Sequence, residues 1–149
     1  MVGRMADIFL NGEIAEAVNG AVLRGPAFVL GYVSADATPS LSFRGSLLVY
    51  SDDQLALWAR NPVDGLARSV AERPPVSLVY YSRDTPGPFY LSIKGRARVA
   101  PELNDFVYEH MVEVERTQDP ERHGVAIVID VDDVVGASTQ GMFLQERTP

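Results

Sequence analysis

The sequence predicts a mainly β domain, a small antiparallel barrel of six strands with flanking helices. Three observations predict this fold class. Short apolar or alternating segments recur along the chain, separated by turn residues such as Pro, Gly, Asn and Asp. One short helical segment interrupts the strand segments between residues 28 and 99. A sheet of this many strands with open edges would invite aggregation, so packing on itself as a barrel is favoured.

The composition and charge narrow the class further. The 149 residues are 46% hydrophobic and 22% charged, which suits one core and predicts a single domain. Within it we expect a helical N-terminus at 5–25, a barrel core at 28–136 and a C-terminal arm at 137–149. The net charge of −7 argues against a nucleic-acid partner. The chain has no Cys, which excludes disulfides and thiolate sites. It has two His, which are too few for a His-rich metal centre.

The first residues and the apolar segments of the chain indicate where in the cell the protein is expected. The first residues carry no long apolar signal segment, and no run approaches the length that crosses a bilayer. We therefore predict a cytoplasmic protein without membrane contact.

The helices and strands follow from hydrophobic periodicity, taken in chain order. Apolar residues at helical spacing predict a first helix from Ile14 to Leu23, stopped by Gly25-Pro26. Two further helices are expected at 63–72 and from Pro101 to about 116, the latter with Pro at its first position. The strands are expected at 28–34, 40–50, 54–60, 76–81, 89–99 and 124–131, with turns at 36–39, 52–53 and 84–88.

Most familiar catalytic signatures are missing. No Gly-rich phosphate loop, metalloprotease motif or nucleophile elbow occurs. His110 lies on the apolar stripe of its helix, which favours a structural, hydrogen-bonded role in the core, and His123 is expected in a loop. The acid pairs 52–53 and 132–133 are neighbours in sequence, so their side chains would point to opposite faces of a strand, and turns or loops explain them better.

Positive charge gathers on one face of the predicted strand 89–99. Lys94, Arg96 and Arg98 alternate with small or apolar residues and therefore share that face. The simpler interpretation is a solvated sheet face with ion pairs to Asp or Glu. The alternative is a surface that binds an anion.

The segment from Ser42 to Ser46 carries the clearest binding signal. Alternation places Ser42, Arg44 and Ser46 on one side, off the apolar face, and Gly45 between them lets another group approach the backbone. Two hydroxyls around a guanidinium suit an anion, because Arg makes paired hydrogen bonds to phosphate.

The next strand adds an aromatic ring and a second cation. Trp58 and Arg60 share a face by the same alternation rule. Together with Arg44 they suit a flat ring that carries a phosphate tail. The alternative is a solvated or interface surface without a ligand.

The order of these segments resembles the flavin-nucleotide-binding split barrel, the superfamily that includes pyridoxamine 5′-phosphate oxidase. The resemblance covers about residues 28–99 and is weaker over the helix and strand that follow. It rests on the order and spacing of four segments, namely the strand beginning Pro39-x-x-Ser42, the strand 55–60, the helix leading into 74–78, and Leu91-x-x-x-Gly95-x-Ala97.

The resemblance implies a set of cofactor-binding positions. Phe43, Arg44, Gly45 and Ser46 match the strand that holds the phosphate and lines the flavin ring, with Ser42 adding a hydrogen bond. The following strand supplies Trp58, Ala59 and Arg60, and Ala59 stands where the family usually has a hydroxyl. The helix before the fourth strand usually carries a phosphate-binding Lys, but this chain has Leu66 there and Arg68 two residues later.

The resemblance also implies a function and a partner. We expect a flavin mononucleotide (FMN)-binding oxidoreductase, a homodimer with its cofactor sites at the subunit interface. Arg44, Arg60 and Arg68 would neutralise the phosphate, and the cofactor would carry electrons or a hydride. Catalytic side chains and the substrate are not specified. The tryptophan-containing C-terminal signature of true pyridoxamine phosphate oxidases is absent, so that reaction is not assigned. The alternative is a non-catalytic dimeric module that carries or senses flavin, deazaflavin or haem, or has no ligand.

Overall fold

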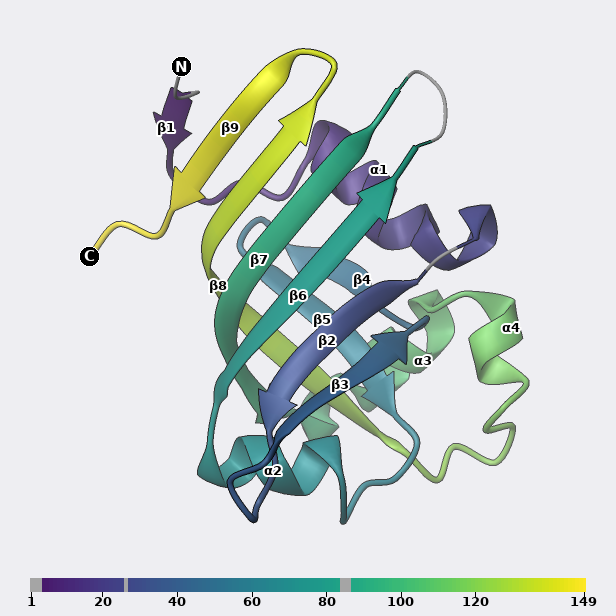
Figure 1. Ribbon diagram of the computed structural model, residues 1–149. Coiled ribbons are helices and arrows are strands. Elements are labelled where there is room, and N and C mark those ends of the chain that lie inside the picture. Colours follow the sequence, from purple (N-terminus) through teal and green to yellow (C-terminus); the bar gives the residue numbers. More distant parts are fainter. Residues whose placement is uncertain (1–3, 26, 84–86) are drawn as a thin grey trace.

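The computed structural model describes residues 4–25, 27–83 and 87–149 (Figure 1). Within these residues the chain forms nine strands: β1 (Arg4–Ala6), β2 (Phe28–Val33), β3 (Pro39–Arg44), β4 (Leu48–Ser51), β5 (Gln54–Ala59), β6 (Pro75–Ser82), β7 (Phe89–Val99), β8 (Val125–Ser138) and β9 (Gly141–Glu146). The hydrogen-bonded path runs β1-β9-β8-β7-β6-β2-β3, and β5 pairs with β8 on one side and with β4 on the other. β1 and β9 are parallel, and the other pairs are antiparallel.

The predicted fold class is confirmed as a mainly antiparallel sheet with flanking helices, but the strand count differs. The segment 40–50 is two strands, because the chain turns at Gly45 and passes from the partner of β2 to the partner of β5. The two chain ends add β1 and β9. No ladder joins β3 to β4 or β5 in the described part of the chain, so the sheet is not closed there.

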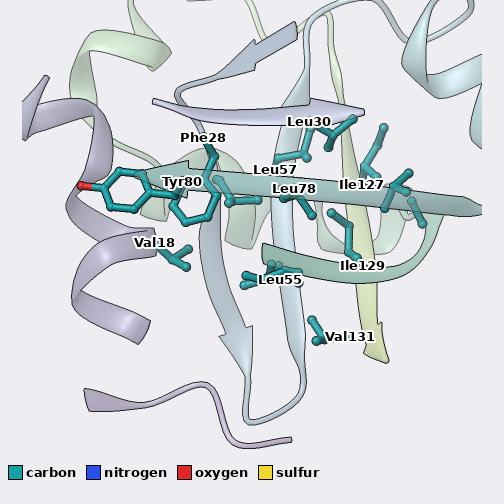
Figure 2. Close-up of a cluster of buried hydrophobic side chains, with 14 of the residues drawn as sticks. Val18, Phe28, Leu30, Leu55, Leu57, Leu78, Tyr80, Ile127, Ile129 and Val131 are labelled. Atoms are coloured by element: carbon teal, nitrogen blue, oxygen red, sulfur yellow. The ribbon is translucent and has the colours of Figure 1, made fainter. Parts of the chain in front are cut away.

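The main core lies between two layers of this curved sheet. β2, β3 and β6 form one layer, and β4 and β5 lie behind it, with β7 and β8 curving between the two (Figure 1). Figure 2 shows the side chains that meet in the middle. The largest include Phe28 and Leu30 from β2, Leu55 and Leu57 from β5, and Ile127 from β8, all with no exposed surface. Burial of this kind stabilises by roughly 25 cal/mol per Å² of apolar surface.

A second, smaller core lies on the other side of β5. Ala56 and Trp58 point there and pack against Val107 and Tyr108 of the helix α3 (Asn104–His110). The first half of β8 is also buried on both faces, as its lack of alternation predicted.

Helices cover the two ends of the main core. α1 (Gly12–Gly20) buries Ile14, Ala17 and Val18 and continues into the 3-10 helix η1 (Ala21–Arg24). α2 (Leu66–Glu72) buries Leu66 and Val70 at the opposite end (Figure 1).

The predicted helix 101–116 is three shorter elements: η2 (Pro101–Leu103), α3 and α4 (Glu113–Arg116). Met111 and Val112 break it because both have extended backbone angles, which sets the buried Met111 into the second core.

The chain ends differ from the sequence expectation. The helical N-terminus predicted from residue 5 begins as a strand, and the C-terminal arm forms β9, which pairs with β8 and β1. Arg147 then donates a 2.9 Å hydrogen bond to Asp53 and anchors the last residues. The predicted stop at Pro26 and part of the turn at 84–88 lie outside the described residues. Within the described ranges, no helix has both the length and the apolar character needed to cross a membrane.

Candidate functional site

The predicted alternation on β3 is confirmed, and it sorts polar from apolar side chains. Ser42 pairs across the ladder with the buried Leu30, so Ser42 and Arg44 lie half-buried on the core side of the strand. Leu41 and Phe43 face outward with 78% and 74% of their surface exposed. Two large apolar side chains therefore face the solvent while a guanidinium is partly enclosed.

The enclosed guanidinium of Arg44 has spare hydrogen-bonding capacity. Its Nε donates to the Ser42 hydroxyl at 3.0 Å. The two terminal nitrogens donate no hydrogen bond to any residue in the described ranges, and no buried side-chain polar atom there lacks a partner, so both nitrogens reach solvent. A guanidinium of this kind is ready to bind an anion with two parallel hydrogen bonds.

The electrostatic surroundings of Arg44 also favour an anion. Burial lowers the pKa of Arg44, and the nearby charge of Arg60 lowers it further, while Tyr32 and Glu115 act in the opposite direction. Arg remains protonated in proteins, so the lowered pKa means that its charge is held at a cost. A bound anion would remove part of that cost.

Arg60 reaches this position because it follows the last residue of β5. Its guanidinium is exposed and donates a 2.7 Å hydrogen bond to the side-chain oxygen of Gln118. We call Arg44 and Arg60 the arginine pair. The two residues follow or end β5 and β3, two strands that no ladder joins in the described residues, and they lie near enough for the charge of Arg60 to lower the pKa of Arg44.

Glu115 provides a counter-charge close to the pair. A Cβ placed on Gly45 would stand 2.7 Å from a carboxylate oxygen of Glu115 and 3.2 Å from a methyl of Val22. The predicted close approach at Gly45 is confirmed, and the approaching groups belong to α4 and η1 of this same chain.

Trp58 does not border the arginine pair. Its side chain is 5% exposed and packs edge-on against Tyr108, with ring centroids 5.3 Å apart. The indole N–H donates to Asp119 at 2.9 Å. The expectation that Trp58 lines a flavin ring is therefore corrected, because the smaller core under α3 encloses the indole.

Asp119 holds the loop that carries Gln118. Besides the Trp58 indole, its carboxylate accepts hydrogen bonds from the backbone N–H groups of His123 (2.9 Å) and Gly124 (2.8 Å). Burial raises the pKa of Asp119, but these hydrogen bonds outweigh burial and the pKa lies below its ordinary value. We call Trp58, Tyr108 and Asp119 the Trp58 cluster.

Ser46 and Ala59 are structural. Ser46 is 3% exposed, and its hydroxyl accepts from the Trp58 backbone N–H at 2.9 Å and donates to the Trp58 carbonyl at 3.3 Å. Ala59 packs in the main core. The expected row of Ser42, Arg44 and Ser46 is thus broken at Gly45, and Ser46 uses its hydrogen bonds to join β4 to β5.

The helix α2 does not contribute to the arginine pair. Leu66 is buried in the core, and Arg68 is exposed and pairs with Asp64 one turn earlier at 3.7 Å. Among the described residues no hydrogen bond or ion pair links Arg68 to Arg44 or Arg60.

Two of the three cations on β7 form ion pairs with acidic residues, as the simpler interpretation of this face predicted. Arg96 binds Asp132 through paired hydrogen bonds of 3.0 and 2.8 Å, and Arg98 binds Glu102 at 2.8 Å. Lys94 is exposed on the same face.

The two pairs of neighbouring acids lie in different kinds of structure. The pair 52–53 lies in the β4–β5 turn as predicted, but Asp132 and Asp133 lie within β8, where the register against β7 shifts. Asp132 accepts hydrogen bonds from Arg96 and lies 3.5 Å from Arg147, which explains the acid without a catalytic role.

Among the described residues no hydrogen bond or ion pair links either histidine to the arginine pair. The predicted structural role of His110 is partly right, because its Nδ1 bonds the Phe106 carbonyl at 2.8 Å and its ring stacks on Phe106. Its side chain is nevertheless exposed. His123 is exposed in a loop, as expected.

Sequence reasoning missed three neighbours of Arg44 and Arg60, namely Tyr32, Glu115 and Gln118. Tyr32 was assigned only to a strand, and Glu115 and Gln118 lie beyond or at the end of the predicted helix 101–116. No local pattern marks them. The pairing of β2 with β3 places Tyr32 near Arg44, and the packing of α4 and its following loop brings Glu115 and Gln118 to the arginine pair.

Comparison with known proteins shows which proteins share this fold. No family model matches the sequence, and no curated protein matches it either. Solved structures do match the fold. A pyridoxamine 5′-phosphate oxidase-related, FMN-binding protein from Nostoc punctiforme aligns with a TM-score of 0.68 and 13% identity over 90% of this chain and 87% of that one.

Two more structures agree with it. An FMN-binding protein from Syntrophomonas wolfei aligns with a TM-score of 0.63 and 11% identity over 85% of this chain and 87% of that one. A heme-binding protein from Mycobacterium smegmatis aligns with a TM-score of 0.61 and 14% identity over 93% of this chain and 63% of that one. The chain therefore has the split-barrel fold of FMN-binding and pyridoxamine 5′-phosphate oxidase-like proteins.

Proposed function

We propose that this protein binds FMN through the arginine pair and serves as a flavin-dependent oxidoreductase. The observation that carries the proposal is the half-buried Arg44, whose terminal nitrogens have no partner among the described residues and whose charge Arg60 destabilises. A phosphate dianion matches this arrangement in charge and in hydrogen-bonding geometry. The fold supports the choice of FMN, because structural neighbours of this architecture bind it.

The residues present fit the phosphate better than they fit the ring. Arg44, Arg60 and Ser42 offer donors, whereas Trp58 and Ala59 are enclosed in the two cores. We therefore assign the phosphate to the arginine pair and leave the ring to surfaces outside the Trp58 cluster. When bound, FMN supplies hydride or single-electron transfer, and the chain supplies charge neutralisation and orientation.

We propose that the protein is a homodimer whose two FMN sites lie at the subunit interface, next to the open edge of β3. The outward face of β3, β2, β6 and β7 exposes a group of large apolar side chains: Leu41, Phe43, Val33, Val79, Tyr81 and Tyr90. β3 is also the last strand of the sheet path, with one edge unpaired in the described residues. Apolar patches and open edges of this kind are typical of protein interfaces.

The dimer is tested by Phe43→Lys, which places a charge in the middle of the apolar face. We expect the native protein to sediment as a dimer and the variant to shift toward a single subunit with unchanged circular dichroism. Native protein that sediments as a single subunit at high concentration contradicts this part of the proposal.

The phosphate assignment is tested by titrating FMN and riboflavin, which lacks the phosphate, in parallel. Arg44→Ala should weaken FMN binding about tenfold or more, since a charge-assisted hydrogen bond contributes roughly 1.5–3 kcal/mol. Riboflavin binding should change little. Arg68→Ala is the matched control, because Arg68 is exposed and paired with Asp64. Equal FMN affinity in the native protein and Arg44→Ala would refute the assignment.

The enzymatic part has its own test. A yellow protein with oxidised-flavin absorbance that a nicotinamide nucleotide bleaches supports an oxidoreductase. The competing function is a carrier or sensor of haem, deazaflavin or flavin, which the fold of the heme-binding neighbour favours. A Soret band in the purified protein, or a bound flavin that no donor reduces, identifies that function instead.

A further inference from the structure

A cavity of about 380 Å³ opens at the end of the main core that α1 covers. Its walls come from one face of α1, the facing ends of β6 and β7, and the turn between β8 and β9. Small-molecule sites usually occupy roughly 300–1,000 Å³. The size therefore suits a compact ligand.

Tyr80 forms the floor of this cavity and has an unused polar group. The residue is 3% exposed, and its ring stacks on Phe28 at a centroid distance of 4.8 Å, which fixes its orientation. Figure 2 shows the hydroxyl directed toward α1. The hydroxyl has no hydrogen-bond partner among the described residues. Its oxygen keeps some accessible surface, and because Tyr80 lines the cavity, the hydroxyl faces it. A hydroxyl that opens into a cavity and has no protein partner is free to hydrogen-bond a ligand or water there.

The wall opposite carries negative charge. Glu13 and Glu16 lie three residues apart on α1 and so share the face that lines the cavity. Neither forms an ion pair within the ranges that the structure describes. Arg24 also lines the cavity, but its guanidinium donates to the carbonyls of Glu16 and Ala17 and so caps the end of α1. Two carboxylates thus remain without a cationic partner there.

The remaining wall is partly apolar. Phe89 lines the cavity and stacks on Phe143, with centroids 6.4 Å apart. An aromatic face attracts a cation, and a carboxylate and a hydroxyl both accept hydrogen bonds from an ammonium group. We propose that this cavity binds a small organic amine, its ammonium group held by Glu13, Glu16 and the Tyr80 hydroxyl and its apolar part on Phe89.

This site is separate from the arginine pair. Arg44 pairs with Phe28 across β3 and β2, and Phe28 stacks on Tyr80 of β6. The ring of Phe28 therefore stands between Arg44 and the cavity. The two sites share no lining side chain and have opposite charge, so the proposal does not depend on FMN binding.

The test uses the full chain and 2-phenylethylamine as the probe, measured by titration calorimetry, with 2-phenylethanol as the neutral analogue. The variants are Tyr80→Phe, which removes only the hydroxyl, and the double variant Glu13→Gln with Glu16→Gln. Glu109→Gln is the matched control, because Glu109 is an exposed acid of α3 far along the chain from α1. Thermal melting verifies that each variant is folded.

The proposal expects the amine to bind more tightly than the alcohol. The double Glu variant should weaken the amine about fivefold or more and Tyr80→Phe about twofold or more, while Glu109→Gln should have no effect. Saturation with FMN should leave amine binding unchanged. Equal binding of amine and alcohol, no binding at about 10 mM amine, or full binding by the folded variants would each overturn the assignment.

Discussion

The arginine pair and the Trp58 cluster come from the same part of the sheet but differ in how their polar groups are satisfied. Trp58 and Arg60 are two residues apart, at and just beyond the end of β5. The indole N–H of Trp58 is used by Asp119, and the Asp119 carboxylate is used by three donors. Arg44 and Arg60 instead keep donors that face solvent. The comparison shows that a shared face does not make a shared site, because a ligand needs groups whose hydrogen bonds are not already taken.

The largest effect that this comparison predicts is on stability. Trp58→Ala removes a buried indole from the smaller core and leaves Asp119 with one donor fewer. We expect a loss of about 3–5 kcal/mol in the free energy of unfolding, measured by urea denaturation. Arg44→Ala should cost far less in the same assay. A Trp58→Ala protein as stable as the native one would show that the Trp58 cluster is not structural.

The two serines of the predicted anion surface should separate in the same way. Ser46→Ala leaves the buried Trp58 backbone N–H without its acceptor and should cost about 1–3 kcal/mol in stability. Ser42→Ala should cost less than about 1 kcal/mol, because water can replace the hydroxyl at the half-buried Arg44 Nε. FMN titration of both variants completes the test: only Ser42→Ala should weaken FMN binding. Weaker FMN binding in a folded Ser46→Ala would place Ser46 back in the site.

Asp119 gives the Trp58 cluster a pH dependence that the arginine pair does not share. Its pKa in the folded protein lies below the ordinary value of 3.8, so the unfolded chain holds this proton more tightly. Its contribution to stability is therefore complete above about pH 5 and is lost as the pH falls through the lower, folded pKa. Asp119→Asn should flatten the fall in stability between about pH 5 and pH 3, as measured by chemical denaturation at each pH. A slope as steep as that of the native protein would contradict this account.

The smallest effect is expected at Tyr80. Because its hydroxyl has no partner among the described residues, Tyr80→Phe should change stability by no more than about 0.5 kcal/mol. Thermal denaturation measures this. A larger loss would mean that the hydroxyl has a protein partner, and it would weaken the amine proposal.

Local pattern predicted several elements closely. β6 and β7 were expected at 76–81 and 89–99 and occur at 75–82 and 89–99, because alternation and flanking turn residues act over a few residues. The alternation on β3 was also correct. It failed at Gly45, where the segment expected as one strand splits into β3 and β4 with different partners.

The candidate site was only half predictable. Arg44, Ser42 and Arg60 were found from alternation, and the structure brings the two arginines together. Strand alternation and the family resemblance also predict Trp58, Ser46 and Ala59 in the site, yet all three are buried structural residues. Nothing local distinguishes a tryptophan that faces a ligand from one that faces α3, since α3 is distant in sequence.

The sequence by itself determined the mainly β class, the boundaries of most strands and which side chains share a face, because these depend on the two-residue period of a strand and on local turn chemistry. Tertiary structure alone decided which polar groups are satisfied. Hydrogen bonds such as Trp58 to Asp119 and Arg60 to Gln118 join residues about sixty positions apart. Their formation depends on how α3, α4 and the loop after them pack on β5, and that packing leaves Arg44 and Arg60, unlike Trp58, with donors that face solvent.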